Sequence, residues 1–98
     1  MKSKNLTKEE LAHMQAVKGL PCGVCGAAPP SDCHHIMQGK HYLCIPLCKS
    51  CHQSSHNGIH QNKHIWKVLK KTEMSVLNDT IFLCLPSEQL HFHAKHLS

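Results

Sequence analysis

The chain has 98 residues, a formal net charge of +5 and 17% charged residues, which together predict one small basic domain. No segment is apolar over the length of a membrane span, and no N-terminal apolar run is typical of a signal peptide. The 7 cysteines are therefore expected to be reduced, in the cytoplasm. A chain this short buries little core, so bound metal is an expected source of stability.

The first half of the sequence predicts a helix, a loop and a hairpin, followed by a second helix. Residues 6–19 are expected to be helical, because Thr7 and Glu10 form a capping-box pattern and Gly19 ends the run. Residues 20–32 are rich in Gly, Pro and Ala and predict a loop. The apolar runs 33–37 and 42–47 predict a β-hairpin. A helix over 49–56 follows, closed by an Asn-Gly pair.

The second half predicts two more helices, over residues 61–71 and 73–83. The first is basic, and the second places Met74, Leu77 and Ile81 on one face. The last dozen residues, from Pro86, show no clear period, and residues 84–98 form a poorly defined tail. The histidines of HFHAKH are not expected to hold metal. We expect a single domain over 1–98, with a core of about 6–83.

Four cysteines occur as two C-x-x-C pairs separated by 22 residues. Such pairs are typical of zinc sites rather than of disulfides, because both thiols of each turn point toward one ion. The sequence therefore predicts a structural Zn²⁺ ion held by Cys22, Cys25, Cys48 and Cys51. That ion would connect the N-terminal loop to the start of the helix over 49–56.

The histidines predict a second metal site. His34 and His35 are adjacent in a strand and point to opposite faces, so only one of them can join a site with the helix. His52 and His56 are four residues apart, which places both on one helix face. A hairpin followed by such a helix is a ββα-metal arrangement, in the α+β class. Three imidazoles leave open positions on an ion, as a catalytic site requires.

These residues also resemble a known family. The pattern Cys22-x-x-Cys25, His34-His35-Ile36 and Leu47-Cys48-x-x-Cys51-His52-x-x-x-His56 is similar to the zinc-stapled HNH (His-Me finger) endonucleases. The text IPLCKSCHQSSHNGIH, the leader TKEELAHMQAVKGLPCGVC and the segment KTEMSVLNDTI resemble the phage recombination-enhancement (Ref-type) nucleases, which depend on RecA. The resemblance runs from about residue 6 to residue 81.

The resemblance implies a metal-dependent endonuclease that hydrolyses DNA phosphodiester bonds, with a RecA filament as a further partner. His34, His52 and His56 match the ligands of the catalytic ion, and His35 matches the general base. His60, in the family-like text NGIH, is a further candidate ligand. The catalytic ion would be Mg²⁺, Mn²⁺, Zn²⁺ or Ni²⁺, and three imidazoles favour the later ions of that series.

The sequence departs from the family pattern at two points. The middle Asn of the motif would fall near Leu43, where there is none, so His41 or Tyr42 would have to replace it. The chain also has no arginine to clamp a phosphate. Lysines would serve instead, and the candidates for DNA phosphate contacts are Lys40, Lys49, Lys63 and Lys67.

Charge is unevenly distributed, since residues 33–72 contain no Asp or Glu, which suits a polyanionic partner. A solvated lysine-rich face is the alternative interpretation. The missing Asn leaves a second functional hypothesis open, in which the chain is a zinc-stapled DNA-binding module with a degenerate, non-catalytic site.

Overall fold

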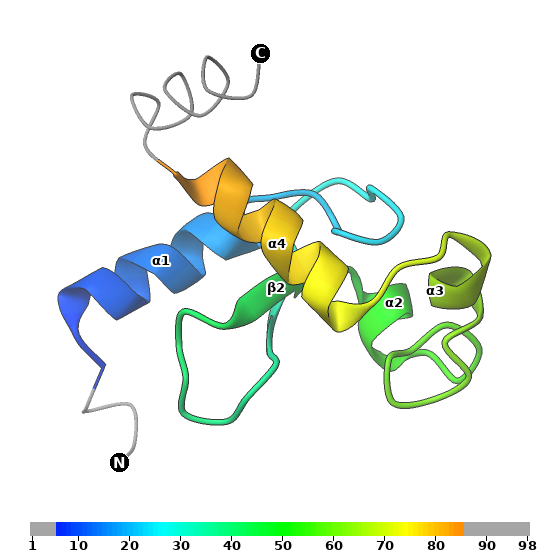
Figure 1. Ribbon diagram of the computed structural model, residues 1–98. Helices are drawn as coiled ribbons and strands as arrows, with labels where there is room; N and C mark the ends of the chain where they lie inside the picture. The colour runs from blue at the N-terminus through cyan, green and yellow to red at the C-terminus, as the bar shows by residue number, and fades with distance from the viewer. Residues whose placement is uncertain (1–5, 86–98) are drawn as a thin grey trace.

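The computed structural model describes residues 6–85, which form a small α+β fold around a two-stranded sheet (Figure 1). The expected α+β class is therefore confirmed. The elements in chain order are α1 (Lys8–Lys18), β1 (Asp32–His35), β2 (Cys44–Leu47), α2 (Lys49–Gln53), α3 (His64–Val68) and α4 (Glu73–Cys84). No helix in this part of the chain is long and apolar enough to cross a membrane. The tail histidines of HFHAKH lie outside the described residues.

Helix α1 lies within the predicted range 6–19, and its capping residues are the predicted ones. The Thr7 side chain accepts a hydrogen bond from the Glu10 backbone, and the Glu10 carboxylate accepts one from the Thr7 N–H, which completes the capping box. Gly19 is the C-cap residue. The helix places Val17, which is fully buried, against the sheet.

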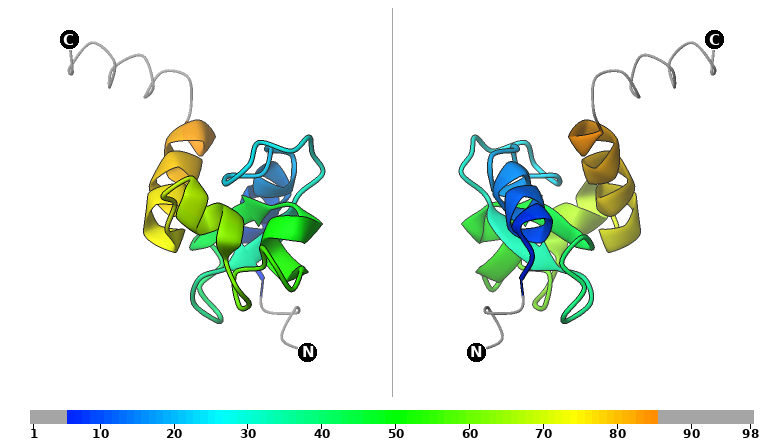
Figure 2. Two further views of the ribbon diagram at one scale, coloured as in Figure 1. Left: turned by 90° about the vertical axis from the view of Figure 1, so that its right-hand side faces the viewer. Right: turned by 90° about the vertical axis from the view of Figure 1, so that its left-hand side faces the viewer.

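The predicted hairpin is confirmed, with strands shorter than expected. β1 and β2 are antiparallel, and His35 lies opposite Cys44, with His34 opposite Ile45. All four residues of β2 are buried, because α1 and α4 both pack against this strand. The side views in Figure 2 show α4 at one side of the hairpin and α1 at the other. The hairpin is therefore a fixed support for the two histidines of β1.

Helix α2 ends at Gln53, so the predicted helix over 49–56 is wrong beyond that residue. Ser54 is extended, and its hydroxyl donates to the Ser50 carbonyl and accepts from the Asn57 N–H. These side-chain bonds compete with the helical ladder and end it. The Gly58 N–H then donates to the Ser54 carbonyl at 2.8 Å, which turns the chain back. The turn buries Ile59 in the core.

The predicted helix over 61–71 is reduced to α3, because Lys63 and Lys70 both adopt left-handed backbone angles. Within α3, Trp66 is almost fully buried, and its indole N–H donates to the Cys51 carbonyl at 3.0 Å. This bond ties α3 to α2. Trp66 therefore belongs to the core, although the helix around it is short.

Helix α4 agrees with the predicted helix over 73–83 and begins with a second capping box, between Thr72 and Ser75. Its buried face consists of Val76, Leu77 and Thr80. The expected apolar face is therefore partly wrong, since Met74 and Ile81 are exposed. Helix α4 places its first residue, Glu73, beside the histidines of β1.

Candidate metal centres

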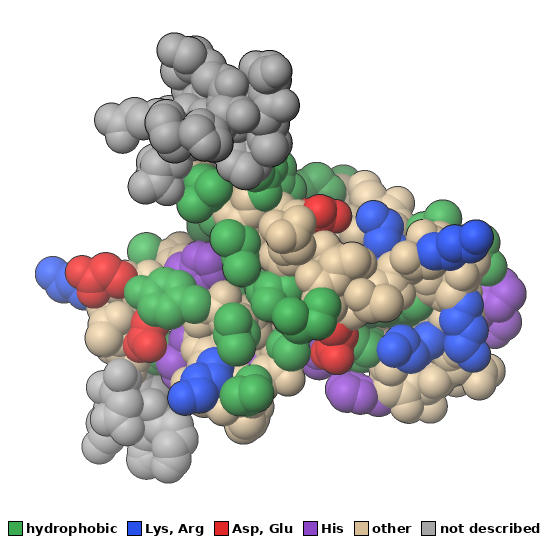
Figure 3. All heavy atoms as spheres, viewed as in Figure 1, with side chains coloured by type: hydrophobic (Ala, Val, Ile, Leu, Met, Phe, Trp, Pro, Cys, Tyr) green, Lys and Arg blue, Asp and Glu red, His purple; other side chains and the backbone are tan. Residues whose placement is uncertain are grey.

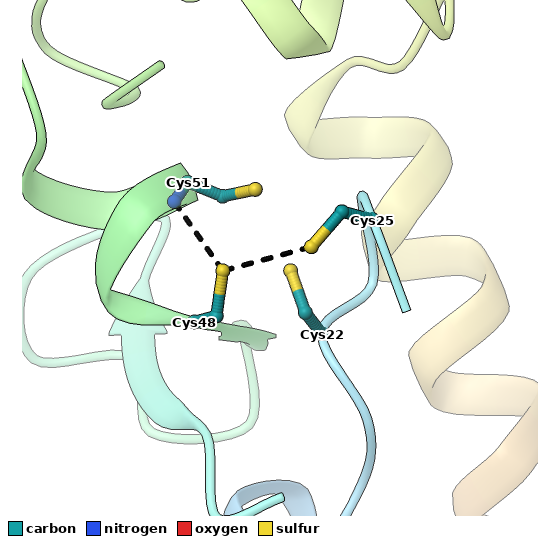
Figure 4. Close-up of side chains that lie close together, drawn as sticks. All are labelled: Cys22, Cys25, Cys48 and Cys51. Atoms are coloured by element: carbon teal, nitrogen blue, oxygen red, sulfur yellow. Dashed lines mark hydrogen bonds between the residues drawn. The ribbon is translucent and has the colours of Figure 1, made fainter. Parts of the chain in front are cut away.

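The four predicted zinc ligands lie together. The sulfurs of Cys22, Cys25, Cys48 and Cys51 are all within 4.8 Å of one another, and Figure 4 shows them facing a common centre. The loop after α1 contributes one pair, and the start of α2 contributes the other. The Cys48 thiol is the N-cap of α2 and accepts from the Cys51 N–H at 3.4 Å. The same turn that starts the helix thus aims both thiols inward.

The dimensions of this cluster fit one tetrahedral ion. With Zn–S bonds of about 2.3 Å, tetrahedral geometry places two sulfurs roughly 3.8 Å apart. The Cys25 and Cys48 sulfurs are 3.6 Å apart, and all four cysteines are free thiols. The cluster can therefore hold a structural metal ion such as zinc, as the sequence predicts.

The thiols of the cluster differ in acidity. Burial raises the pKa of Cys22, but hydrogen bonds from the backbone of Cys25, Cys48 and Val24 outweigh it and lower that pKa to about 7. Burial raises the pKa of Cys51, as does the neighbouring Cys22 charge. Because the thiolate is the form that binds metal, the backbone hydrogen bonds that lower the pKa of Cys22 favour metal binding at this cluster.

A second constellation lies in a cleft of about 470 Å³ beside the hairpin. Its lining comes from β1 and the start of the hairpin turn, from α2, from the turn after α2 and from α4. The lining residues are Cys33, His34, His35, Ile36, Gln38, His52, His60 and Glu73. Four of the eleven histidines of the chain therefore share this cleft with one carboxylate.

His34 is at the centre of the imidazoles in this cleft. Its ring centre is 5.1 Å from that of His52 and 5.6 Å from that of His60. Two imidazoles that share one ion, with bonds of about 2.0–2.1 Å, have ring centres roughly 5 Å apart. The ring spacing therefore suits a shared ion. Within residues 6–85, however, only the four cysteines bring three or more ligand atoms within 4.8 Å, so the histidines need side-chain rotation to converge.

Two carboxylates that sequence reasoning did not assign contact these histidines. Asp32 Oδ2 is 2.9 Å from His52 Nδ1, and Glu73 Oε2 is 2.9 Å from His34 Nε2. Hydrogen bonds from Lys49 and then from His52 lower the pKa of Asp32. The position of Asp32, two residues before His34 in the sequence, is a signal from which its contact with the histidine site could have been predicted. Glu73 is 39 residues from His34 in the sequence, and no local pattern predicts their contact.

The expected general base, His35, lies on the same strand as His34 and lines the same cleft. Its Nε2 is 3.2 Å from Nδ1 of His41, which lies in the hairpin turn. Burial lowers the pKa of His35, and the nearby His41 and His34 lower it further. A lowered pKa keeps the imidazole neutral at physiological pH, which is the form that can accept a proton.

Of the two candidates for the missing Asn, only His41 contacts His35. Tyr42 is exposed, and its ring lies 5.2 Å from that of His13 on α1. Of the two, His41 is therefore the one placed to restrain the His35 ring.

The structure does not bring His56 to the other predicted ligands. Because α2 ends at Gln53, the expected helical spacing between His52 and His56 is absent. The His56 ring is exposed and stacks on His64, with ring centres 4.4 Å apart. The turn through Gly58 instead carries His60 to His34. The Asn57-Gly58 pair, which the sequence prediction places at the end of a helix over 49–56, instead belongs to this turn, and the helix already ends at Gln53.

The candidate phosphate-binding lysines lie at different places on the surface. Lys40 is exposed in the hairpin turn, and Lys67 is exposed on α3. Lys63 lies 5.5 Å from the centre of the Trp66 ring. Lys49 donates to Asp32 at 2.8 Å, although its side chain is 78% exposed. Figure 3 shows lysine side chains gathered at the α3 end of the molecule.

Comparisons with known proteins add nothing to these observations. No protein-family model, no curated protein and no solved structure matches this chain.

Proposed function

We propose that this protein is a metal-dependent endonuclease of the HNH type, which hydrolyses DNA phosphodiester bonds. The observation that carries the proposal is the cleft in which His35 lies beside His34, His52 and His60. One imidazole there would act as a base, and the three others would hold an ion after their side chains rotate toward one another. The resemblance of the cysteine and histidine pattern to HNH nucleases supports the same assignment.

In this proposal, His34, His52 and His60 hold a divalent ion, with His60 in the place expected for His56. Three imidazoles suit Zn²⁺ or Ni²⁺ by softness, and Mn²⁺ or Mg²⁺ when an oxygen ligand joins them. Such an ion supplies Lewis-acid stabilisation of the charge that develops on the phosphate and on the leaving oxygen. The cysteine cluster has a different task, because it fixes the start of α2 and so fixes His52.

The remaining residues of the cleft perform the proton transfer. His35 accepts a proton from the attacking water, and His41 holds the His35 ring in place through its contact with Nε2. The lowered pKa of His35, caused first by burial, keeps the base unprotonated near neutral pH. General-base catalysis of this kind contributes about 10²–10⁴-fold to the rate.

The DNA backbone would contact lysines rather than arginines. Lys40 is exposed in the hairpin turn, while Lys63 and Lys67 belong to the α3 end. Each acts as a point charge without bidentate geometry. Binding that depends on such contacts weakens steeply with salt.

Two further parts of the proposal rest on the family resemblance and on the cysteines. The Ref-type resemblance supports a role in phage DNA recombination, with a RecA filament that presents the DNA. The free thiols of the cluster support a reducing location, which is the cytoplasm of a bacterial host.

A plasmid-nicking assay tests the enzymatic function. Zinc-loaded protein is incubated with supercoiled plasmid and with single-stranded DNA, each with Mg²⁺, Mn²⁺, Ni²⁺ or added Zn²⁺. We expect cleavage that requires the added ion and that stops with His52→Ala. Parallel reactions with RecA filaments test whether the filament is needed.

The opposite outcome has a clear meaning. Salt-dependent DNA binding without cleavage under any of these ions, on bare DNA and on RecA filaments alike, would contradict the nuclease and favour a zinc-stapled binding module. Cleavage of bare duplex would instead retain the nuclease and remove strict dependence on RecA.

A further inference from the structure

We propose that Glu73 is a positioning residue of the histidine site, which selects the tautomer of His34 and so exposes Nδ1 of that ring to a metal ion. The inference rests on the proposed function for the presence of the ion, but its first step concerns His34 and Glu73 alone. Nothing in the sequence pattern pointed to Glu73, which is 39 residues from His34.

The contact between the two side chains is short and is buried on the histidine side, while the Glu73 side chain is 36% exposed. Glu73 Oε2 is 2.9 Å from His34 Nε2, and the His34 side chain is only 10% exposed. Glu73 is the first residue of α4, where the helix N-terminus favours a negative side chain. It is also the only acidic residue that lines the described cleft.

Hydrogen-bond chemistry then fixes the tautomer. A carboxylate only accepts hydrogen bonds, so Nε2 of His34 must carry the proton. In a neutral imidazole the other nitrogen, Nδ1, then has a free lone pair. Glu73 therefore determines which nitrogen of His34 can bind an ion, and it restrains the ring plane at the same time.

His52 has the same kind of contact with a carboxylate, but with the roles of its two ring nitrogens exchanged. Asp32 accepts from Nδ1 of His52 at 2.9 Å, which leaves Nε2 of that ring free. The two rings, with centres 5.1 Å apart, are thus each held by a carboxylate from a different element. A carboxylate behind each ligating histidine is the usual support of a metal site, and its loss costs about 10- to 100-fold in metal affinity.

Helix α4 is held in a fixed position, so the contact between Glu73 and His34 has a defined geometry. Thr72 and Ser75 cap the helix at the residues on either side of Glu73. Val76, fully buried in the next turn, packs in the core with residues of β2. The carboxylate therefore approaches His34 from a helix whose position is fixed by the core.

The test uses full-length protein with zinc on the cysteine cluster and no ion at the histidine site. Long-range ¹H–¹⁵N correlation spectra report the tautomer of each histidine ring. We expect His34 to be protonated on Nε2 in the wild type and to become a tautomer mixture in Glu73→Ala. Glu73→Gln keeps an accepting oxygen and is expected to restore most of the Nε2–H form. Asp79→Asn, on the exposed side of α4, is the matched control and should change nothing.

Calorimetric titration with Ni²⁺ then measures the affinity of the histidine site in the same proteins. We expect binding about 10- to 100-fold weaker in Glu73→Ala, an intermediate value in Glu73→Gln, and wild-type affinity in Asp79→Asn. The zinc content of the cysteine cluster should be equal in all four.

The outcomes separate this inference from the proposed function. An unchanged His34 tautomer in Glu73→Ala would overturn the positioning role, as would unchanged Ni²⁺ affinity. If the wild type binds no second ion but its tautomer still depends on Glu73, the metal-dependent function fails while the tautomer selection stands.

Discussion

The turn at Gly58 brings His60 to the cleft, and the substitution Gly58→Ala, which adds one methyl group, tests this role. A Cβ added at Gly58 would lie 2.5 Å from the Ser54 carbonyl oxygen and 3.0 Å from the Gln53 carbonyl carbon. The first contact is roughly 0.9 Å shorter than an ordinary van der Waals contact, and both partners are backbone atoms that cannot rotate away. Gly58→Ala must therefore displace the turn.

We expect this displacement to cost about 1–3 kcal/mol of unfolding free energy, as for other overpacked sites. For a domain of this size each kcal/mol lowers Tm by about 4–8 °C. Thermal unfolding followed by circular dichroism measures the loss, and Ni²⁺ titration should show weaker binding at the histidine site because His60 moves.

Gly19→Ala is the matched control. Its added Cβ would meet only the Ala16 and Gln15 carbonyl oxygens, at 3.5 and 3.8 Å, and its φ of −82° suits alanine. We expect a change within about 0.5 kcal/mol there. If Gly58→Ala is as stable as Gly19→Ala and binds Ni²⁺ as the wild type does, the tight turn and its placement of His60 are refuted.

Three further predictions concern the metal sites and the core. Cys48→Ser should lose the bound zinc and unfold at a lower temperature, whereas Cys84→Ser should keep the zinc and the wild-type Tm. If metal analysis and thermal melts showed the same behaviour for the two variants, the assignment of the cysteine cluster as a zinc site would be contradicted. His60→Ala should weaken Ni²⁺ binding at the cleft and His56→Ala should leave it unchanged, so the reverse order in calorimetry would favour the spacing expected from the sequence. Trp66→Phe should lower the free energy of unfolding, measured in urea, by about 1–3 kcal/mol, because the Cys51 carbonyl in α2 loses its indole donor. A decrease below about 0.5 kcal/mol would count against that hydrogen bond.

The parts of the fold that the sequence predicted depend on local chemistry. Thr7 and Glu10 form a capping box within four residues, and the C-x-x-C spacing fixes the direction of two thiols within one turn. The interaction that completes each feature lies within a few residues, or is implied by the ligand type. Such features can be read before the tertiary structure is known.

The parts that the sequence did not predict depend on competition or on distance along the chain. Helix α2 ends early because the Ser54 hydroxyl bonds to backbone groups on both sides, and helical spacing alone cannot reveal that competition. The separation of His56 from the histidines of the cleft has the same cause. The contact of Glu73 with His34 joins two elements through the packing of α4, which no local pattern encodes.

The most direct test of the nuclease proposal is the single-turnover rate of plasmid nicking by His35→Ala. His35 is not among the three proposed ligands, so the variant should bind Ni²⁺ at the cleft with wild-type affinity. With the general base removed, its rate should fall by about 10²–10⁴-fold. Equal nicking rates in the two proteins, at equal metal occupancy, would contradict the assignment of this cleft as the site of hydrolysis.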